Sequence, residues 1–174
     1  MLKLEEGLQS IGSKAKIPIR IAFVDSNKEP GVISLWYAYI NGRILCATQK
    51  SAKIVRYLKE NPFCGFEIAA DSPPYKGVRG KGIAKIIEND GYKVLGILID
   101  KYLENKESNL SQFLERKAKT EVAIEITPKN IFNYDYSQRM KGVWVQQYKL
   151  ALVSNLHTRL NNFVAYDIWG KCNK

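Results

Sequence analysis

The stretch VISLWYAYINGRILCATQKSAKIVR, residues Val32–Arg56, contains the pattern that decides the fold. Two β-rich apolar runs, Val32–Ile40 and Arg43–Thr48, stand on either side of the pair Asn41-Gly42. Because both residues of that pair tolerate a positive φ angle, this order predicts two strands joined by a two-residue hairpin turn. The centre of the stretch is therefore antiparallel β-structure.

A short helix is expected directly after the hairpin. In SAKIVRYLKENP, residues 51–62, Ser51 is expected to cap the helix and Asn61-Pro62 to end it. The apolar residues between these two signals fall on one helical face, and they are Ile54, Val55 and Leu58.

Further strands are predicted on both sides of this centre. Ile17–Val24 precedes it and is joined to it by the turn Asp25–Gly31, whereas Phe63–Ala70 follows the helix. Asp71–Tyr75 is a turn, and Gly77–Ile87 is a long strand whose interior glycines indicate a bulge or a close approach by something flat.

The pattern becomes helical from residue 91 to residue 119, where two helices are expected. The tract Glu104–Ser108 separates them, and Ser108 is a candidate cap for the second helix. The expected apolar face of the first helix is Val94, Leu95, Leu98 and Tyr102, and that of the second is Leu110, Phe113 and Leu114.

The chain then returns to β-structure. Glu121–Ile126 alternates between polar and apolar residues, and Ile131–Tyr136 follows Pro128 as an aromatic continuation. Apolar residues at mixed helical spacing after Val143 predict a C-terminal helix. The whole is an α+β domain of six to seven mostly antiparallel strands with flanking helices, which favours a closed or partly closed β-barrel.

Length and composition bound the rest. At 174 residues the chain fits one domain, residues 1–174, with a core of about residues 17–136 and a C-terminal extension of about residues 141–174. No apolar run reaches the roughly 20 residues of a membrane-spanning helix, so a cytoplasmic location is expected. The three cysteines, Cys46, Cys64 and Cys172, form no disulfide or zinc pattern, and the first two are expected in the core.

The net charge indicates an anionic partner without identifying it. Lysine and arginine outnumber aspartate and glutamate by 27 to 17, a formal charge of +10. Such a surface attracts nucleic acid, phosphorylated cofactors, acidic substrates and anionic membranes alike, and it also serves simply to keep a protein soluble.

The segment TQKSAKIVR, residues Thr48–Arg56, is the best candidate for a binding site. A strand ends there in Thr48 and Gln49, and Lys50, Ser51 and Lys53 then lead into the helix. Free N–H groups and the positive end of the helix dipole favour a phosphate at such a turn. A helix start with solvated lysines remains the alternative.

The order of these elements resembles a known family. The hairpin with Ser34-Leu35-Trp36-Tyr37, the basic turn and Asn61-Pro62 together are similar to the pyridoxamine 5'-phosphate oxidase-like FMN-binding split β-barrels, including their deazaflavin-dependent relatives. The resemblance extends to Tyr75–Ile86 and Thr127–Tyr136, and so covers about residues 17–136. It implies a split barrel that forms a homodimer, with flavin at the subunit interface.

The resemblance also implies roles for individual residues. Arg20 and the backbone of Ile21 and Ala22 would lie along the flavin, Thr48 near its ribityl chain, and Ser51 and Lys53 on its phosphate. Lys50 is an additional phosphate candidate. The remaining expected cofactor-binding residues are Gln49 beside this turn, Trp36 near the ring and Arg79 on the later strand.

The expected activity is hydride transfer between bound FMN and a small substrate or second cofactor. The flavin performs the difficult chemistry, so no acid or base is required, and none of the residue clusters indicates a catalytic triad or a metal site. A deazaflavin coenzyme could replace FMN on the same fold, and a flavin sensor without turnover is a third possibility.

A basic barrel that binds nucleic acid is the alternative from another functional class. Trp36, Tyr37 and Tyr39 could stack on bases, but they alternate like residues of a half-buried strand, and no nucleic-acid reader motif is present. The single histidine, His157, is expected to have a structural or surface role rather than a catalytic one.

Overall fold

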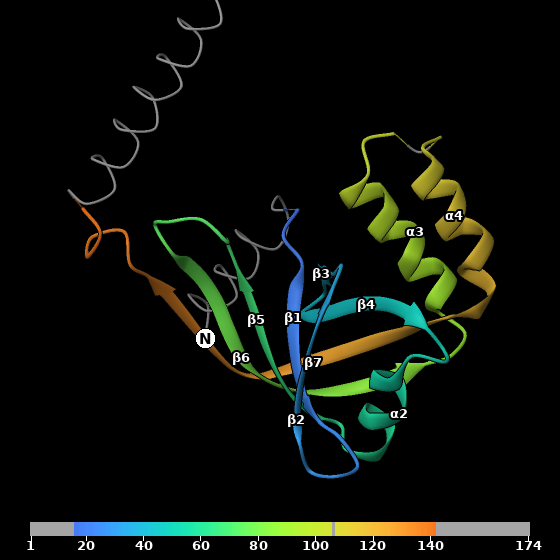
Figure 1. The fold of residues 1–174 in the computed structure, drawn as a ribbon, viewed down its shortest axis with the longest axis horizontal. Coiled ribbons are helices and arrows are strands. Elements are labelled where there is room, and N and C mark those ends of the chain that lie inside the picture. Colours follow the sequence, from blue (N-terminus) through green and yellow to red (C-terminus); the bar gives the residue numbers. More distant parts are fainter. Residues whose placement is uncertain (1–15, 106, 142–174) are drawn as a thin grey trace, which may run out of the picture. The chain divides into compact units, whose positions relative to one another are not determined.

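The computed structural model describes residues 16–105 and 107–141, which form a curved antiparallel sheet with helices packed against it (Figure 1). The predicted α+β architecture is confirmed, with seven strands in this part of the chain. In chain order the elements are β1 (Ile19–Val24), β2 (Pro30–Leu35), β3 (Ala38–Ile40), β4 (Arg43–Gln49), α2 (Lys53–Glu60), β5 (Phe63–Ala69), β6 (Lys76–Ile87), α3 (Gly91–Tyr102), α4 (Asn109–Lys117), the 3-10 turn η1 (Ala118–Thr120) and β7 (Glu121–Asp135).

The strand order in the sheet is β2-β1-β5-β6-β7-β4-β3. Strand β2 pairs with β1, and β4 pairs with β3 and β7, so no ladder joins β2 to β4 in the described residues. Residues of β2 and β4 nevertheless line one groove, so the sheet curls until these strands meet. We call this meeting of β2 and β4, which no ladder joins in the described residues, the seam.

The central hairpin has the predicted turn. Asn41 and Gly42 both have positive φ angles, of 50° and 76°, and Ile40 pairs with Arg43 across them. The single strand expected at Val32–Ile40 is wrong, however, because it breaks at Trp36 and Tyr37 into β2 and β3.

Side chains of α3 explain this break. The backbone carbonyl of Tyr37 accepts a hydrogen bond from Nζ of Lys101 at 2.9 Å, and its N–H donates to the hydroxyl of Tyr102 at 3.4 Å. The Lys101 ammonium also lies 3.9 Å from the centroid of the Tyr37 ring. Burial of this cluster lowers the pKa of Lys101 to about 8. The backbone at the break is therefore bound to a helix instead of to a neighbouring strand.

For α2 and α3 the expected apolar faces are correct, whereas of the two expected helix caps only that of α4 is correct. The apolar faces expected for α2 and α3 are buried. Ser51 is not the cap of α2, because the helix begins one residue later than expected and its N-cap is Ala52. Ser108 does cap α4, since its hydroxyl accepts a hydrogen bond from the N–H of Ser111 at 3.2 Å.

The apolar face expected for α4 is largely exposed. Leu110 and Phe113 are 47% and 50% exposed, and Leu114 is the member of that face that packs on the α3 residues Leu95 and Ile99. Helix α4 therefore contacts α3 through Leu114, whereas Leu110 and Phe113 remain half exposed.

The main core lies between the inner face of the sheet and α2. Cys46 and Cys64 are buried in it, as expected. The close approach expected at the glycines of β6 is confirmed, but the approaching group is protein. A Cβ atom on Gly80 would lie 2.2 Å from the carbonyl oxygen of Asn130 in β7 and 2.6 Å from the Phe66 ring.

Strand β7 joins the two segments expected around Pro128 into one long strand. The described chain divides into two compact units, of which the first contains the residues up to Asp71 and Lys76–Tyr134. In the second unit, the N–H of Tyr136 donates to the carbonyl of Tyr75 at 2.9 Å, and the Pro73-Pro74 bond is cis. The C-terminal helix, His157 and Cys172 lie outside the described residues.

No helix in the described ranges is both long and apolar enough to traverse a membrane. Within the same ranges, no three histidine, cysteine, aspartate or glutamate side chains gather where they could hold a metal ion.

Candidate functional site

The turn from β4 into α2 is compact and leaves two polar side chains facing solvent. The N–H of Lys50 donates to the carbonyl of Thr120 at 2.8 Å, and the N–H of Ala52 donates to that of Gln49 at 2.9 Å. Ser51 and Lys53 are exposed, and no described residue forms a hydrogen bond or ion pair with either side chain. The turn therefore presents a hydroxyl and an ammonium group beside the amino end of α2.

Lys50 differs from Lys53 in having a partner. Its Nζ lies 2.7 Å from Glu88 of the segment after β6, and the same carboxylate binds Nζ of Lys59 at 2.7 Å. These two contacts, with the hydrogen bond from Lys50 as the larger cause, lower the pKa of Glu88 to about 2. Lys50 is thus already engaged by a carboxylate, which it shares with Lys59.

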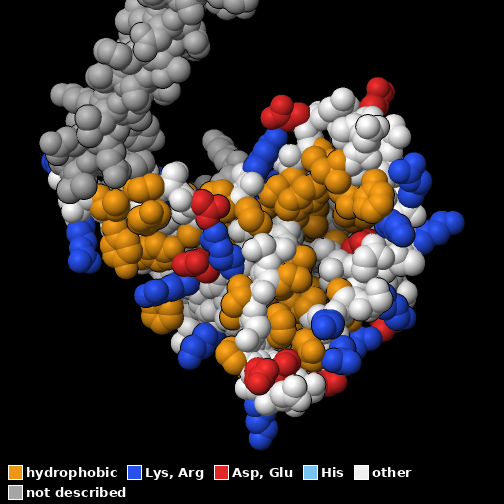
Figure 2. Space-filling view, in the orientation of Figure 1, with side chains coloured by type: hydrophobic (Ala, Val, Ile, Leu, Met, Phe, Trp, Pro, Cys, Tyr) orange, Lys and Arg blue, Asp and Glu red, His pale blue; other side chains and the backbone are white. Residues whose placement is uncertain are grey.

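Three further predicted residues line a groove at the seam, beneath α3 and α4. The groove has a volume of about 280 Å³ and contains Trp36, Thr48 and Gln49 in its wall. Trp36 stacks on Tyr102 of α3, with ring centroids 4.8 Å apart and planes at 6°. We call this space the seam groove. Figure 2 shows hydrophobic side chains gathered over the α3 and α4 region.

A polar group forms one end of the seam groove. The side-chain amide of Gln49 donates to Glu121 through its nitrogen and accepts from the hydroxyl of Thr120 through its oxygen. Burial raises the pKa of Glu121, against the opposing effect of the hydrogen bond from Gln49. This role was not predicted, because Glu121 opens an alternating strand and a charged residue at such a position is usually exposed.

Arg20, Ala22 and Arg79 line a different depression, on the outer face of β1, β5 and β6. This outer groove has a volume of about 540 Å³. Ala22 of β1 pairs with Gly65 of β5, and both line the groove. Because neither residue has a large side chain, the backbone forms much of the groove floor at this point. Ile21 is fully buried in the main core, and it is paired with β2 on one side and β5 on the other.

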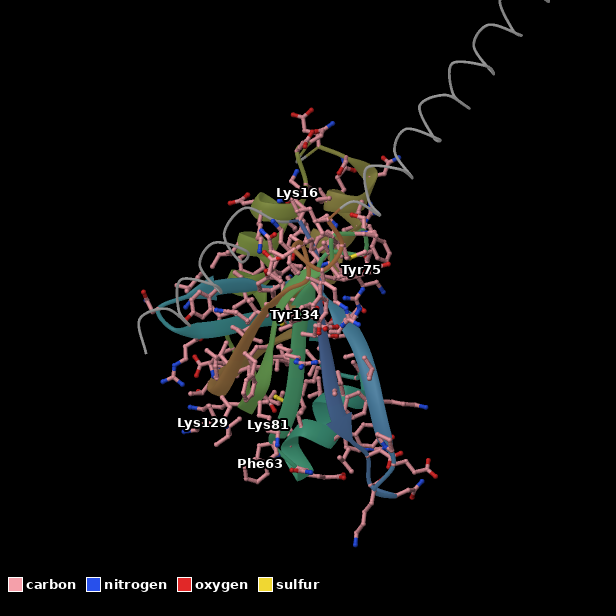
Figure 3. All side chains as sticks on the ribbon, turned by 90° about the vertical axis from the view of Figure 1, so that its left-hand side faces the viewer. Lys16, Phe63, Tyr75, Lys81, Lys129 and Tyr134 are labelled. Carbon is pink, nitrogen blue, oxygen red and sulfur yellow. The ribbon has the colours of Figure 1, made fainter. Side chains whose placement is uncertain are left out.

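A ladder of charged and aromatic side chains crosses this outer face. Arg20 forms ion pairs with Glu67, at 3.9 Å, and with Asp71. The hydroxyl of Tyr134 donates to Glu67 at 2.9 Å, and the guanidinium of Arg79 lies 5.6 Å from the Tyr134 ring centroid. Figure 3 shows Tyr134 on the sheet, where it belongs to β7, and Lys81 and Lys129 together toward one end of the sheet.

The predicted residues therefore separate into three places. Lys50, Ser51 and Lys53 form the turn, a second set lines the seam groove, and a third lines the outer groove. The seam groove adjoins the turn through Thr48 and Gln49, whereas the outer groove shares no lining residue with either. One chain does not gather all of them around a single cavity.

Solved structures of other proteins share this fold. No protein-family model and no curated protein matches the sequence. An F420 reductase is 16% identical with a TM-score of 0.57, over 70% of this chain and 93% of its own. A putative pyridoxamine 5'-phosphate oxidase from Listeria innocua is 16% identical with a TM-score of 0.57, over 75% and 97%. HutZ, a heme storage protein from Vibrio cholerae, is 14% identical with a TM-score of 0.58, over 74% and 93%.

These likenesses establish that the chain has the split β-barrel fold of pyridoxamine 5'-phosphate oxidase-like proteins and F420 reductases. The expected resemblance in fold is thereby confirmed. Since the same fold occurs in a heme storage protein, the fold by itself does not specify the ligand.

Proposed function

We propose that this protein is a flavin-binding redox protein that holds FMN by its phosphate at the turn between β4 and α2. The observation that carries the proposal is the pairing of two features. Ser51 and Lys53 have no protein partner among the described residues, and they adjoin a groove lined by Thr48, Gln49 and Trp36. A phosphorylated molecule with a ring is the ligand that such a neighbourhood suits.

The phosphate end has a clear physical basis. The first N–H groups of a helix lack intrahelical partners, and the helix dipole adds a partial positive charge at the same point. Lys53 is the first residue of α2, so its ammonium and the backbone N–H groups act on one anion. Lys50 contributes less, because binding a phosphate would require it to leave Glu88.

A homodimer would unite the separated parts of the site. Arg20, Ala22 and Arg79 lie on the outer groove, apart from the phosphate turn of the same chain. We infer that the outer groove of one copy faces the flavin held at the turn of the other, which places a flavin at each end of the subunit interface. The apolar floor at Ala22 and Gly65 suits burial against a second copy.

Bound flavin supplies hydride-transfer chemistry, and the chain's own residues supply position and surroundings. Trp36, held against Tyr102, offers an aromatic wall, and Arg79 and Lys81 offer positive charge at the outer groove for an anionic substrate or second cofactor. No side chain is assigned a proton-transfer role. The proposed reaction is therefore a flavin-dependent oxidation or reduction of a small molecule.

A deazaflavin coenzyme is the second candidate ligand. Arg79 and Lys81 lie next to each other on the outer groove, and neither has a carboxylate partner among the described side chains. Such a pair suits a cofactor with an acidic tail more than it suits FMN, whose negative charge is confined to one phosphate.

Titration with three ligands tests the proposal. The purified full chain is titrated with FMN, riboflavin and a deazaflavin coenzyme, with ligand fluorescence as the readout and molar mass measured by light scattering. We expect FMN to bind at one molecule per chain in a dimer, and riboflavin to bind at least about tenfold more weakly because it lacks the phosphate. Preference for the deazaflavin would favour the second candidate. Equal affinity for FMN and riboflavin, or no binding of any of the three, would refute the proposed site.

A further inference from the structure

The walls of the seam groove are mostly apolar, and their polar members are Ser34, Thr48, Gln49 and Glu121. Leucines from β2 and from both α3 and α4 line the groove together with Trp36, and they are Leu35, Leu95, Leu98, Leu110 and Leu114. A volume of about 280 Å³ suits a molecule of one ring and a short chain. Apolar walls favour a ligand with apolar surface, but because apolar contacts have no direction, they do not fix the orientation of that ligand.

One carboxylate supplies that orientation. Glu121 is 9% exposed, yet it lines the groove. Gln49 donates to its Oε1, and no described residue donates to its Oε2. The exposed part of Glu121 is small, and because this residue lines the groove, its side chain borders that space. The groove is the space that Glu121 lines, and an acceptor oxygen is therefore available to a molecule inside it.

No cation of the described chain balances this carboxylate. The ion pairs of the described residues include none to Glu121, and its neighbour Gln49 is neutral. A buried carboxylate without a cationic partner is costly in free energy, and a ligand that brings a positive charge removes that cost. The raised pKa of Glu121 reflects the same deficit.

We propose that the seam groove binds a small apolar molecule carrying a protonated amine, with its ring against Trp36 and the leucines and its ammonium on Oε2 of Glu121. This inference goes beyond flavin binding and does not depend on it. It arises from one carboxylate without a cationic partner in a mostly apolar groove, within a protein whose net charge is positive.

Paired ligands that differ only in charge test the inference. The full chain is titrated by calorimetry with phenethylamine and with 2-phenylethanol, in which a hydroxyl replaces the ammonium, at about pH 8 so that a carboxyl of raised pKa is ionised. The amine is expected to bind at least about tenfold more tightly than the alcohol. Equal affinities, or no heat with the amine, would overturn the proposal.

Variants connect that preference to one carboxylate. Glu121→Gln keeps the size of the side chain and removes its charge, and it should abolish the preference for the amine. Glu125→Gln, on the same strand but outside the lining of the groove, is the matched control and should retain the preference. A preference that survives in Glu121→Gln contradicts the assignment.

A second readout does not depend on the folding of a variant. In methyl NMR spectra of the unmodified protein, phenethylamine should shift the resonances of Leu110 and Leu114, and unchanged leucine signals at saturating amine would contradict the location. Because both ligands would contact Trp36 in the same groove, a separate titration of amine-free protein with FMN distinguishes the two proposals. If FMN fails to bind while the amine still binds through Glu121, only the flavin proposal is lost, and the reverse result removes only the amine site.

Discussion

Replacement of Lys53 by alanine is the most direct test of the phosphate turn. Lys53 opens α2, its ammonium has no partner among the described residues, and its removal leaves no unpaired carboxylate behind. The substitution should also leave the helix intact, because alanine is the best helix former and the buried face of α2 consists of other residues. A change in FMN affinity would therefore report the loss of a contact with the ligand.

The structure also sets the expected size of the effect. One charge-assisted hydrogen bond to a phosphate contributes about 1 to 3 kcal/mol, which corresponds to about 5- to 140-fold in the dissociation constant. Lys50→Ala should cost less than Lys53→Ala, because Lys50 must first leave Glu88 at 2.7 Å. The assay is quenching of FMN fluorescence at fixed ionic strength, since salt screens exposed charges.

Lys129→Ala is the matched control. Lys129 is an exposed lysine of β7, so its loss lowers the net charge equally without touching the turn. If Lys53→Ala and Lys129→Ala weaken FMN equally, the effect is one of overall charge and the site is refuted. If Lys50→Ala weakens FMN more than Lys53→Ala does, the reasoning from the Glu88 ion pair is wrong.

Other consequences of the structure can be measured separately. Glu88→Gln should tighten FMN binding in the fluorescence titration, because it releases Lys50 toward the phosphate, and unchanged affinity would contradict this. Gly80→Ala should lower the free energy of unfolding in urea by about 1 to 3 kcal/mol, because its Cβ would overlap β7, whereas Gly96→Ala, with open space and a helical position, should raise it by up to about 1 kcal/mol. Burial raises the pKa of Glu121, so the folded state holds this proton more tightly than the unfolded state does. Stability from this residue is thus lost as pH rises above the ordinary value of 4.5, and Glu121→Gln should flatten that part of the stability profile.

The strands and helices could be predicted from local pattern because their signals are local. Alternation located β1, β4, β5 and β6 within one or two residues at each end, and Asn41-Gly42 determined the hairpin through its positive φ angles. Ser108 acts as a cap because an exposed hydroxyl directly before a helix has few other partners. These features depend on residues next to each other in the chain.

The features that were missed depend on residues far apart. The break at Trp36 and Tyr37 is caused by Lys101 and Tyr102, which follow more than sixty residues later. The apolar face of α4 is largely exposed because, of its three expected residues, Leu114 is the one that packs on α3. Helical spacing in the sequence identifies an apolar face but not the element that covers it. Residue types on the turn indicated an anion site, but the ion pair of Lys50 with Glu88 and the carboxylate of Glu121 in the seam groove required the folded arrangement.

The seam between β2 and β4 is the place in this sheet where mutation can change the size of a binding groove with least damage to strand pairing. Elsewhere in the sheet, moving two neighbouring strands apart breaks a row of backbone hydrogen bonds, but no such ladder joins β2 to β4 in the described residues. Replacing the groove-lining leucines of α3 or α4 by smaller residues can therefore enlarge the seam groove without breaking the backbone pairing between strands. Ligand size is accordingly the trait that mutation can adjust most freely in this architecture, and the paired strands beneath it need not change.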